Sequence, residues 1–255
     1  MSLGALILVP NTLDFGALPD GAPPPDLRGV LPQAVIETAA RLGHWACENA
    51  RTTRAFLKRV HAVAPLARPL QAIEIRELPR PPKGRAAEPP DLRPLLAPAL
   101  AGHDLGLLSE AGLPAVADPG AALVAAAHAA GLAVRPLAGP SALLLALAAS
   151  GLNGQSFAFV GYVPQEAAAQ AARLRELEAQ SRRLGQTQLM IETPYRNAAL
   201  LRALLAALAP DTRLSVSCGL TLAEGWTRSA SVAHWKREPI ELPADRPAVF
   251  ALLAG

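Results

Sequence analysis

The stretch that decides the fold reads LGLLSEAGLPAVADPGAALVAAAHAAG, residues 105–131. Its start, residues 105–109, is mostly apolar and typical of a short buried strand. Its alanine-rich end, 121–130, is typical of a helix, and Gly131 fits the glycine that ends such a helix. Small residues and prolines fill the loop between them, 109–120. The stretch therefore predicts one strand–loop–helix unit of an α/β fold.

The loop at 109–120 fits two interpretations. In an open parallel sheet, ligands bind beyond the carboxyl ends of the strands, and Gly112 and Gly120 would let the backbone approach a ligand without a Cβ in the way. Asp118 and Pro119 also fit an N-cap followed by a proline at the first helical position. Taken alone, the loop is better explained by an ordinary capped turn, because small-residue turns of this kind are common.

Strand-like and helical segments alternate along the rest of the chain, which predicts two α/β domains. The first, residues 1–138, is expected to hold a mostly parallel sheet. The second, 139–255, is expected to hold a mixed sheet with an antiparallel edge, because its last strands lie close together in the sequence. Two proline-rich stretches, 10–32 and 79–90, are expected to be loops. The expected strands are 5–9, 44–47, 73–77, 105–109, 133–137, 157–163, 189–191, 214–218, 228–232 and 248–253, and the expected helices are 35–42, 51–60, 92–101, 121–130, 141–150, 167–184 and 198–208.

Composition restricts the class of protein. Hydrophobic residues make up 51% of the 255 residues, which is enough for a large core, while the charges nearly balance at 24 Lys+Arg against 21 Asp+Glu. That balance permits RNA binding without requiring it. Cys47 and Cys218 lack a nearby partner, so buried reduced thiols are expected, and no metal site. The apolar run 3–9 is too short for a signal peptide or a membrane span, so a cytoplasmic protein is expected.

Three further polar turns follow predicted strands: LAGPSA at 137–142, ETPYRN at 192–197 and ENARTTR at 48–54. Helix caps at Ser141, Asn197 and Asn49 would explain much of each turn. Groups that could hold a ligand are present in the same places, and both interpretations remain open. No phosphate-binding loop, nucleophile elbow or zinc motif occurs, and the five isolated histidines are expected to be structural: His44, His61, His103, His128 and His234.

In order and spacing, these turns resemble the tetrapyrrole methylase superfamily. Within it they are most similar to the small-subunit ribosomal RNA 2′-O-methyltransferase I family, which methylates a cytidine ribose. The pattern S-D-A-G-x-P-x-x-x-D-P-G of that family resembles residues 109–120, with Glu110 in place of Asp. Five more of its patterns are similar to this chain: P-G-P-S-A to 138–142, F-x-G-F-L-P to 159–164, Y-E-S-P-H-R to 191–196, E-D-T-R-x-T to 48–53 and R-E-L-T-K-x-x-E to 218–224.

The resemblance implies two α/β domains of the tetrapyrrole methylase type, with S-adenosylmethionine in the cleft between them, and a homodimer. The cofactor-binding residues that it implies are Pro10, Glu110, Ala111, Gly112, Leu113, Pro114, Val116, Ser141, Ala142, Glu192 and Leu220. A methyl acceptor such as a ribose hydroxyl also needs a base or electrostatic assistance. The candidates are Glu110 or Glu192 to assist the nucleophile and Arg51 to orient an anionic group.

The chain departs from the family pattern in its first domain. Asn49 and Ala50 replace the Asp and Thr of E-D-T-R, the T-P-I-G-N that follows the first strand is altered after Pro10, and a proline-rich stretch replaces an expected H-x-x-N-E segment. Three functions therefore compete: ribosomal RNA ribose 2′-O-methylation, methylation of a tetrapyrrole or other small molecule, and binding of S-adenosylmethionine without catalysis.

Overall fold

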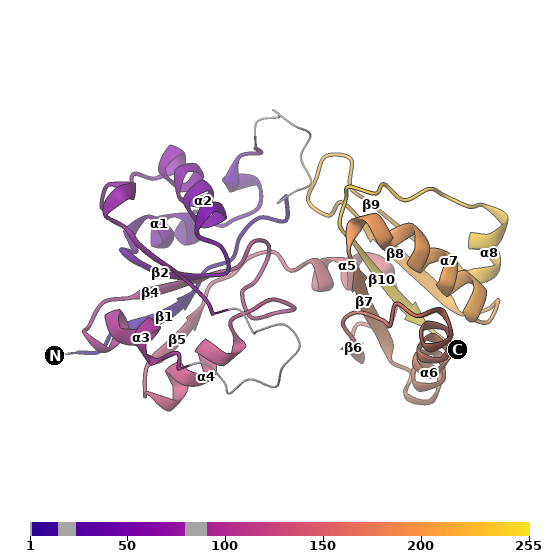
Figure 1. Ribbon diagram of the computed structural model, residues 1–255. Helices are drawn as coiled ribbons and strands as arrows, with labels where there is room; N and C mark the ends of the chain where they lie inside the picture. Colours follow the sequence, from indigo (N-terminus) through magenta and orange to yellow (C-terminus); the bar gives the residue numbers. More distant parts are fainter. Residues whose placement is uncertain (1, 15–23, 80–90) are drawn as a thin grey trace. The chain divides into compact units, whose positions relative to one another are not determined.

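The computed structural model describes residues 2–14, 24–79 and 91–255 (Figure 1). They form two compact units, one ending at Pro140 and the other starting at Ser141. The sequence analysis placed the domain boundary between 138 and 139. Residues 15–23 and 80–90 of the two predicted proline-rich loops lie outside the described residues.

The first unit is built on a five-stranded parallel sheet in the order β3-β2-β4-β1-β5. In register, Leu6 of β1 and His44 of β2 both lie opposite Leu105 of β4. The strands are β1 (Ala5–Leu8), β2 (His44–Cys47), β3 (Glu74–Glu77), β4 (Leu105–Leu108) and β5 (Ala133–Pro136).

Helices cover both faces of this sheet. One core cluster joins Ile36 of α1 and Phe56 of α2 to Trp45 of β2. The other joins Leu96 of α3 and Leu123 of α4 to strand residues of the opposite face. The helices are α1 (Gln33–Arg41), α2 (Ala50–Val63), α3 (Arg93–Leu100) and α4 (Ala121–Ala129), with short 3₁₀ helices at Leu27–Gly29 and Leu70–Ala72.

The second unit holds a mixed five-stranded sheet in the order β6-β7-β10-β8-β9. Its strands are β6 (Phe157–Phe159), β7 (Thr187–Glu192), β8 (Arg213–Cys218), β9 (Trp226–Ser231) and β10 (Ala248–Leu253). The edge strand β9 is antiparallel to β8, but β10 is also antiparallel and lies in the middle, between β7 and β8. Antiparallel pairing therefore occurs at the β9 edge, as predicted, and also in the middle of the sheet.

Helices lie on both faces of the second sheet as well. A core cluster with Leu177 of α6, Leu204 of α7 and Trp235 of α8 covers one face. Leu143 and Leu147 of α5 pack against Leu189 and Val249 on the other. The helices are α5 (Ala142–Ser150), α6 (Ala167–Leu184), α7 (Asn197–Ala207) and α8 (Val232–Arg237), and a 3₁₀ turn spans Pro194–Arg196.

Local signals at helix ends give mixed results. Asn49 caps α2 as predicted, since its side chain accepts from Arg51 N and Thr52 N, and Gly131 follows α4 with φ +71°. Asp118 is not an N-cap, because α4 begins at Ala121 and Gly120 occupies the cap position. Asn197 is the first residue of α7 instead of its cap.

Two more expectations concern cysteines and membranes. Cys47 and Cys218 are free and buried as expected, and burial raises the pKa of both thiols. Within the described ranges, each helix is too short or too polar to cross a bilayer.

Candidate functional site

The polar turns of the first unit follow neighbouring parallel strands. Strands β1, β2 and β4 are adjacent in the sheet and point the same way, so their carboxyl ends meet at one edge. The loops that leave them carry residues 9–14, 48–49 and 109–120. This edge therefore gathers three of the segments that the sequence analysis singled out.

Asn11 joins the loop after β1 to the loop after β4. Its main-chain N–H donates to Gly112 O at 2.9 Å, which forms an antiparallel bridge between the two residues. Its side-chain Nδ2 donates to Ser109 O at 3.2 Å and to Glu110 O at 2.9 Å. The Asn11 amide is buried, so these bonds fix the first turn of the 109–120 loop.

A partly buried ion pair connects the loop after β1 to α2. Arg59 Nη2 lies 2.9 Å from Asp14 Oδ2, and Arg59 Nη1 donates to Thr12 Oγ1 at 3.1 Å. Thr12 Oγ1 also donates to Asp14. The pair thus attaches the residues that follow Asn11 to the middle of the helix.

Three carboxyl groups gather at this edge. Glu110 N donates to Glu48 Oε2 at 3.2 Å. Burial, with the added negative charges of Glu48 and Glu110, raises the pKa of Asp118 to about 7. A carboxyl whose pKa lies near neutrality can accept or release a proton at physiological pH. Asp118, which the sequence analysis treated only as a helix cap, therefore joins Glu110 among the candidate bases.

The backbone of the loop is held in conformations that side chains rarely adopt. Ala115 and Ala117 have φ values of +66° and +63°, and Gly112 has +67°. Such strained non-glycine residues concentrate at functional sites. Val116, between the two alanines, is 44% exposed, while the buried Ser109 hydroxyl has no hydrogen-bond partner among the described residues. The unusual backbone and the unpartnered Ser109 hydroxyl thus make this loop a candidate ligand site.

In the second unit, β7 and β8 end on either side of β10. Ala248 pairs with Glu192 on one side and with Cys218 on the other. Glu192 is buried, and its Oε1 accepts from Thr193 N at 2.8 Å while its Oε2 lies 3.2 Å from Arg196 Nε. These contacts fix the 192–197 turn and leave Glu192 better suited to holding the turn than to accepting a proton.

Asn197 and the start of α5 complete this edge. Asn197 Nδ2 donates to Arg246 O at 3.0 Å, and its buried Oδ1 has no partner among the residues described. Ser141 is the N-cap residue of α5 by position, without a side-chain cap bond. Ala142 and Leu220 pack against the same apolar cluster as Ile191.

The predicted site residues therefore form two sets. The first unit brings together Pro10 and the 110–116 segment, through Asn11 and Gly112. The second unit brings together Ala142, Leu220 and the end of β7, with Ser141 and Glu192 as their chain neighbours. Arg51 lies exposed in the first turn of α2. The sequence analysis missed Asp14, Arg59, Asp118 as a base and Asn197 as a buried amide. For Asp14 the available signal was a charged residue in a largely apolar segment.

A family model described as Tetrapyrrole (Corrin/Porphyrin) Methylases matches residues 30–228. The chain belongs to the tetrapyrrole methylase family. In fold it resembles the crystal structure of the methyltransferase CobJ, with a TM-score of 0.56 at 16% identity over 99% of this chain and 100% of that one. The two α/β units are thus those of the family fold.

Curated relatives align with part of this tetrapyrrole methylase. It is 38% identical over 127 residues to Ribosomal RNA small subunit methyltransferase I of Mesorhizobium japonicum, covering 50% of this chain and 42% of that protein. It is 41% identical over 129 residues to the protein of that name from Micromonospora olivasterospora, covering 51% and 40%. The aligned part spans less than half of each relative.

Proposed function

We propose that this tetrapyrrole methylase transfers the methyl group of S-adenosylmethionine to a ribose 2′ hydroxyl of small-subunit ribosomal RNA. The observation that carries the proposal is the Asn11–Gly112 bridge, which fixes the S-E-A-G-L-P loop at the carboxyl edge of the first sheet. Family membership supports the cofactor, and the names of the partial relatives support the RNA acceptor.

The described residues fit a nucleoside cofactor. A largely uncharged adenosine needs main-chain donors and acceptors, small side chains and apolar contacts. The 110–116 segment offers these, together with the unpartnered Ser109 hydroxyl. Pro10, Glu110, Ala111, Gly112, Leu113, Pro114 and Val116 in the first unit, and Ser141, Ala142, Glu192 and Leu220 in the second, are the residues proposed to hold it. That one cofactor molecule contacts both sets stays a prediction.

When bound, the sulfonium cofactor supplies an electrophilic methyl group for an in-line displacement. The protein must align the acceptor oxygen with it and receive the proton that the hydroxyl loses as the O–C bond forms and the S–C bond breaks. Glu110 and Asp118 are the candidate bases at the first sheet edge, and Arg51 is proposed to orient a phosphate of the acceptor. Glu192 remains a candidate, with the positioning role that its contacts favour.

One departure from the family pattern leaves the local structure of the first unit intact. Asn49 replaces an Asp, yet its side chain still accepts from Arg51 N and Thr52 N. Asn and Asp are equally good N-caps, so the start of α2 is preserved. Binding without catalysis thus gains no support from this substitution.

Calorimetric titration of S-adenosylmethionine is the first test. We expect saturable binding by the wild type and a large loss of affinity in Gly112→Ala, whose new Cβ would lie 3.3 Å from Leu13. Gly131→Ala is the matched control, because Gly131 has a similar φ of +71° but open space around its Cβ position. Absence of binding by a folded wild-type protein would contradict the proposal.

The acceptor is tested with radiolabelled cofactor. We expect label in the RNA of small ribosomal subunits purified from a strain that lacks the corresponding methylation. Label only in a small-molecule extract would favour the small-molecule alternative. Cofactor binding without transfer to either acceptor would favour a protein that has lost catalysis. Glu110→Gln and Asp118→Asn, measured with Glu176→Gln on α6 as a surface control, then test the proposed bases.

A further inference from the structure

Basic residues concentrate on one face of α2. Arg51, Arg54, Lys58 and His61 occur at spacings of three, four and three residues, which places them along one side of a helix, and all four are exposed. The whole chain nearly balances its charges, with 24 Lys+Arg against 21 Asp+Glu, whereas α2 contains no acidic residue. We call these four residues the α2 stripe; at about 1.5 Å per residue it extends for about 15 Å.

The α2 stripe is not neutralised by the carboxylates that contact the helix. Asp14 pairs with Arg59, which lies on a different side of α2. Glu77 Oε1 accepts from the main-chain N–H of Ala50 at the start of the helix. Lys58 takes part in no hydrogen bond or ion pair with any of the described residues. Neither of these two carboxylates forms an ion pair with a stripe residue, so among the described residues the stripe presents net positive charge to solvent.

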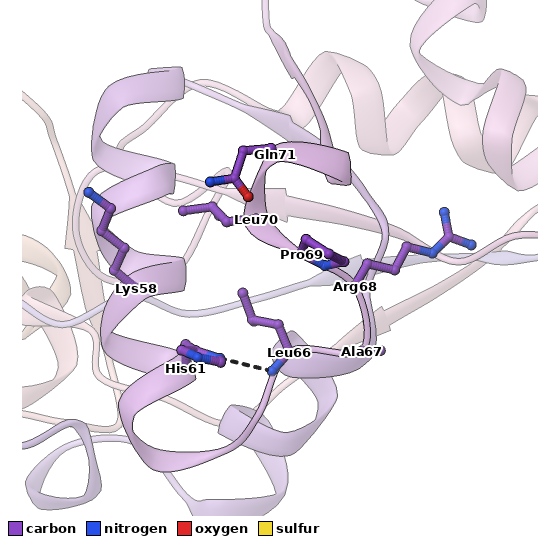
Figure 2. A pocket seen from close by; sticks show the side chains of 8 residues that line it. All are labelled: Lys58, His61, Leu66, Ala67, Arg68, Pro69, Leu70 and Gln71. Atoms are coloured by element: carbon purple, nitrogen blue, oxygen red, sulfur yellow. Dashed lines mark hydrogen bonds between the residues drawn. The ribbon is translucent and has the colours of Figure 1, made fainter.

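The stripe ends at a hollow of about 530 Å³ between α2 and residues 66–71 (Figure 2). Lys58 and His61 lie on its helix side, and Leu66 and Leu70 supply apolar surface between the helix and the loop. His61 Nδ1 accepts from Leu66 N at 3.3 Å. Because that nitrogen accepts, the neutral ring carries its proton on Nε2, which remains available as a donor.

Arg68 adds a further cation on the loop side. Its guanidinium forms no hydrogen bond or ion pair with a described residue, and it lies beside Gly43, where an added Cβ would come within 3.2 Å of Arg68 Cζ. An extended guanidinium next to a glycine leaves a planar face on which a base can stack. The hollow thus combines apolar surface, a hydrogen-bond donor and two cations, in the volume range of small-ligand sites.

We propose that the α2 stripe and this hollow bind single-stranded RNA, with phosphates along the stripe and one unstacked nucleotide in the hollow. The inference rests on the proposed function, since it assigns a docking surface for the same RNA substrate. Phosphodiester charge complements the stripe, and unstacked nucleotides of single strands are what proteins read in RNA. The surface is separate from the residues proposed to hold the cofactor.

The test measures binding of the full chain to a fluorescein-labelled single-stranded RNA of mixed sequence. Fluorescence anisotropy gives the affinity at a range of salt concentrations. The variant combines Arg54→Gln, Lys58→Gln and Arg68→Gln, all at exposed positions. The matched control combines Arg175→Gln, Arg183→Gln and Arg202→Gln, which removes the same charge from exposed positions of the second unit.

We expect the α2 variant to bind RNA more weakly than the control variant. Each phosphate contact to a single strand contributes about 0.7 to the slope of log affinity against log salt, so loss of the Arg54 and Lys58 contacts lowers that slope by about 1.4. Over a fourfold rise in salt, the wild type should then lose roughly seven-fold more affinity than the variant. Cofactor affinity and the urea unfolding midpoint should not change.

Three results would overturn the inference. One is equal RNA affinity and salt slope in the α2 variant and the wild type, and another is an equal loss in the control variant. The third is binding to phosphatidylserine vesicles in place of RNA, which would indicate a membrane surface. Calorimetry with S-adenosylmethionine is run on the same samples. Cofactor binding by a protein that does not bind RNA through the stripe refutes this surface alone. Absence of cofactor binding refutes the proposed function.

Discussion

Arg59 Nη2 lies 2.9 Å from Asp14 Oδ2, and this pair connects α2 to the segment that follows β1. Asp14 is 7% exposed and the Arg59 side chain 19%, so neither charge is well hydrated. The segment includes Asn11, which holds the loop after β4. The ion pair therefore fixes the segment that in turn fixes the loop of the candidate site.

Loss of either charge should destabilise the first unit. Asp14→Ala leaves the Arg59 guanidinium buried without its carboxylate, and breaking such a pair costs about 3 kcal/mol. The double variant Asp14→Ala with Arg59→Met should lose less than the sum of the two single changes, because no charge is then left unpaired. Urea unfolding of the four proteins gives the coupling energy; additive losses would show that the pair contributes nothing specific.

Asn11→Asp should weaken both folding and cofactor binding. The substitution replaces an NH₂ donor by a carboxylate that faces the carbonyl oxygens of Ser109 and Glu110. The loss of two hydrogen bonds at a buried site is expected to cost about 1–3 kcal/mol. Unfolding and calorimetry measure the two effects. Asn153→Asp in the second unit, which removes one donated bond to Gly185 O, should leave cofactor affinity unchanged.

Gly139→Ala should destabilise the protein although the change is small. A Cβ at Gly139 would lie 2.2 Å from Cβ of Pro10, so the loops after β5 and β1 would have to separate. Overpacking of this kind costs about 1–3 kcal/mol. Gly154→Ala, where nothing lies within 4 Å of the added atom, is the control. Equal melting temperatures for the two variants would show that the contact between these loops is not tight.

Asp118 should make stability depend on pH. The pKa of Asp118 is raised to about 7 in the folded protein from an ordinary 3.8. Between these values the folded state binds a proton that the unfolded state has released, so stability falls as pH rises from about 4 through 7. We expect Asp118→Asn to flatten this dependence and to be more stable than the wild type at pH 8.

The measurement is the urea midpoint of the wild type and Asp118→Asn at a series of pH values across that window. Asp211→Asn, at an exposed position of the second unit, controls for removal of one negative charge. Parallel curves for the wild type and Asp118→Asn would contradict the raised pKa.

Hydrophobic periodicity, together with the residues that begin or end helices and strands, predicted most of the fold because these signals are local. The apolar run 105–108 became β4 with the predicted start, and Asn49 caps the helix that it precedes. The central position of β10 could not be predicted, since the order of strands in a sheet depends on pairing between segments far apart in sequence. The helix α8 was missed because six residues are too few to display a helical period.

The candidate site was also predicted only in part from the sequence. The glycines and prolines of 109–120 indicated a ligand loop, but its detailed path could not be foreseen, because Ala115 and Ala117 adopt φ values that favour glycine. The helix α4 begins at Ala121 as predicted, but Gly120 occupies its cap position in place of Asp118. The pKa of Asp118 is raised first by burial and then by the charge of Glu48, a residue distant in sequence, so both causes arise only in the folded protein.

The place of β10 has a consequence for biosynthesis. Residues 248–253 are translated after every other strand of the second sheet, yet they pair with both β7 and β8. Until they leave the ribosome, the two halves of that sheet have no shared partner and keep two open edges, which are prone to pair with other chains. The second unit thus reaches its native pairing only after synthesis of its last strand, whereas the parallel sheet of the first unit needs nothing beyond residue 136.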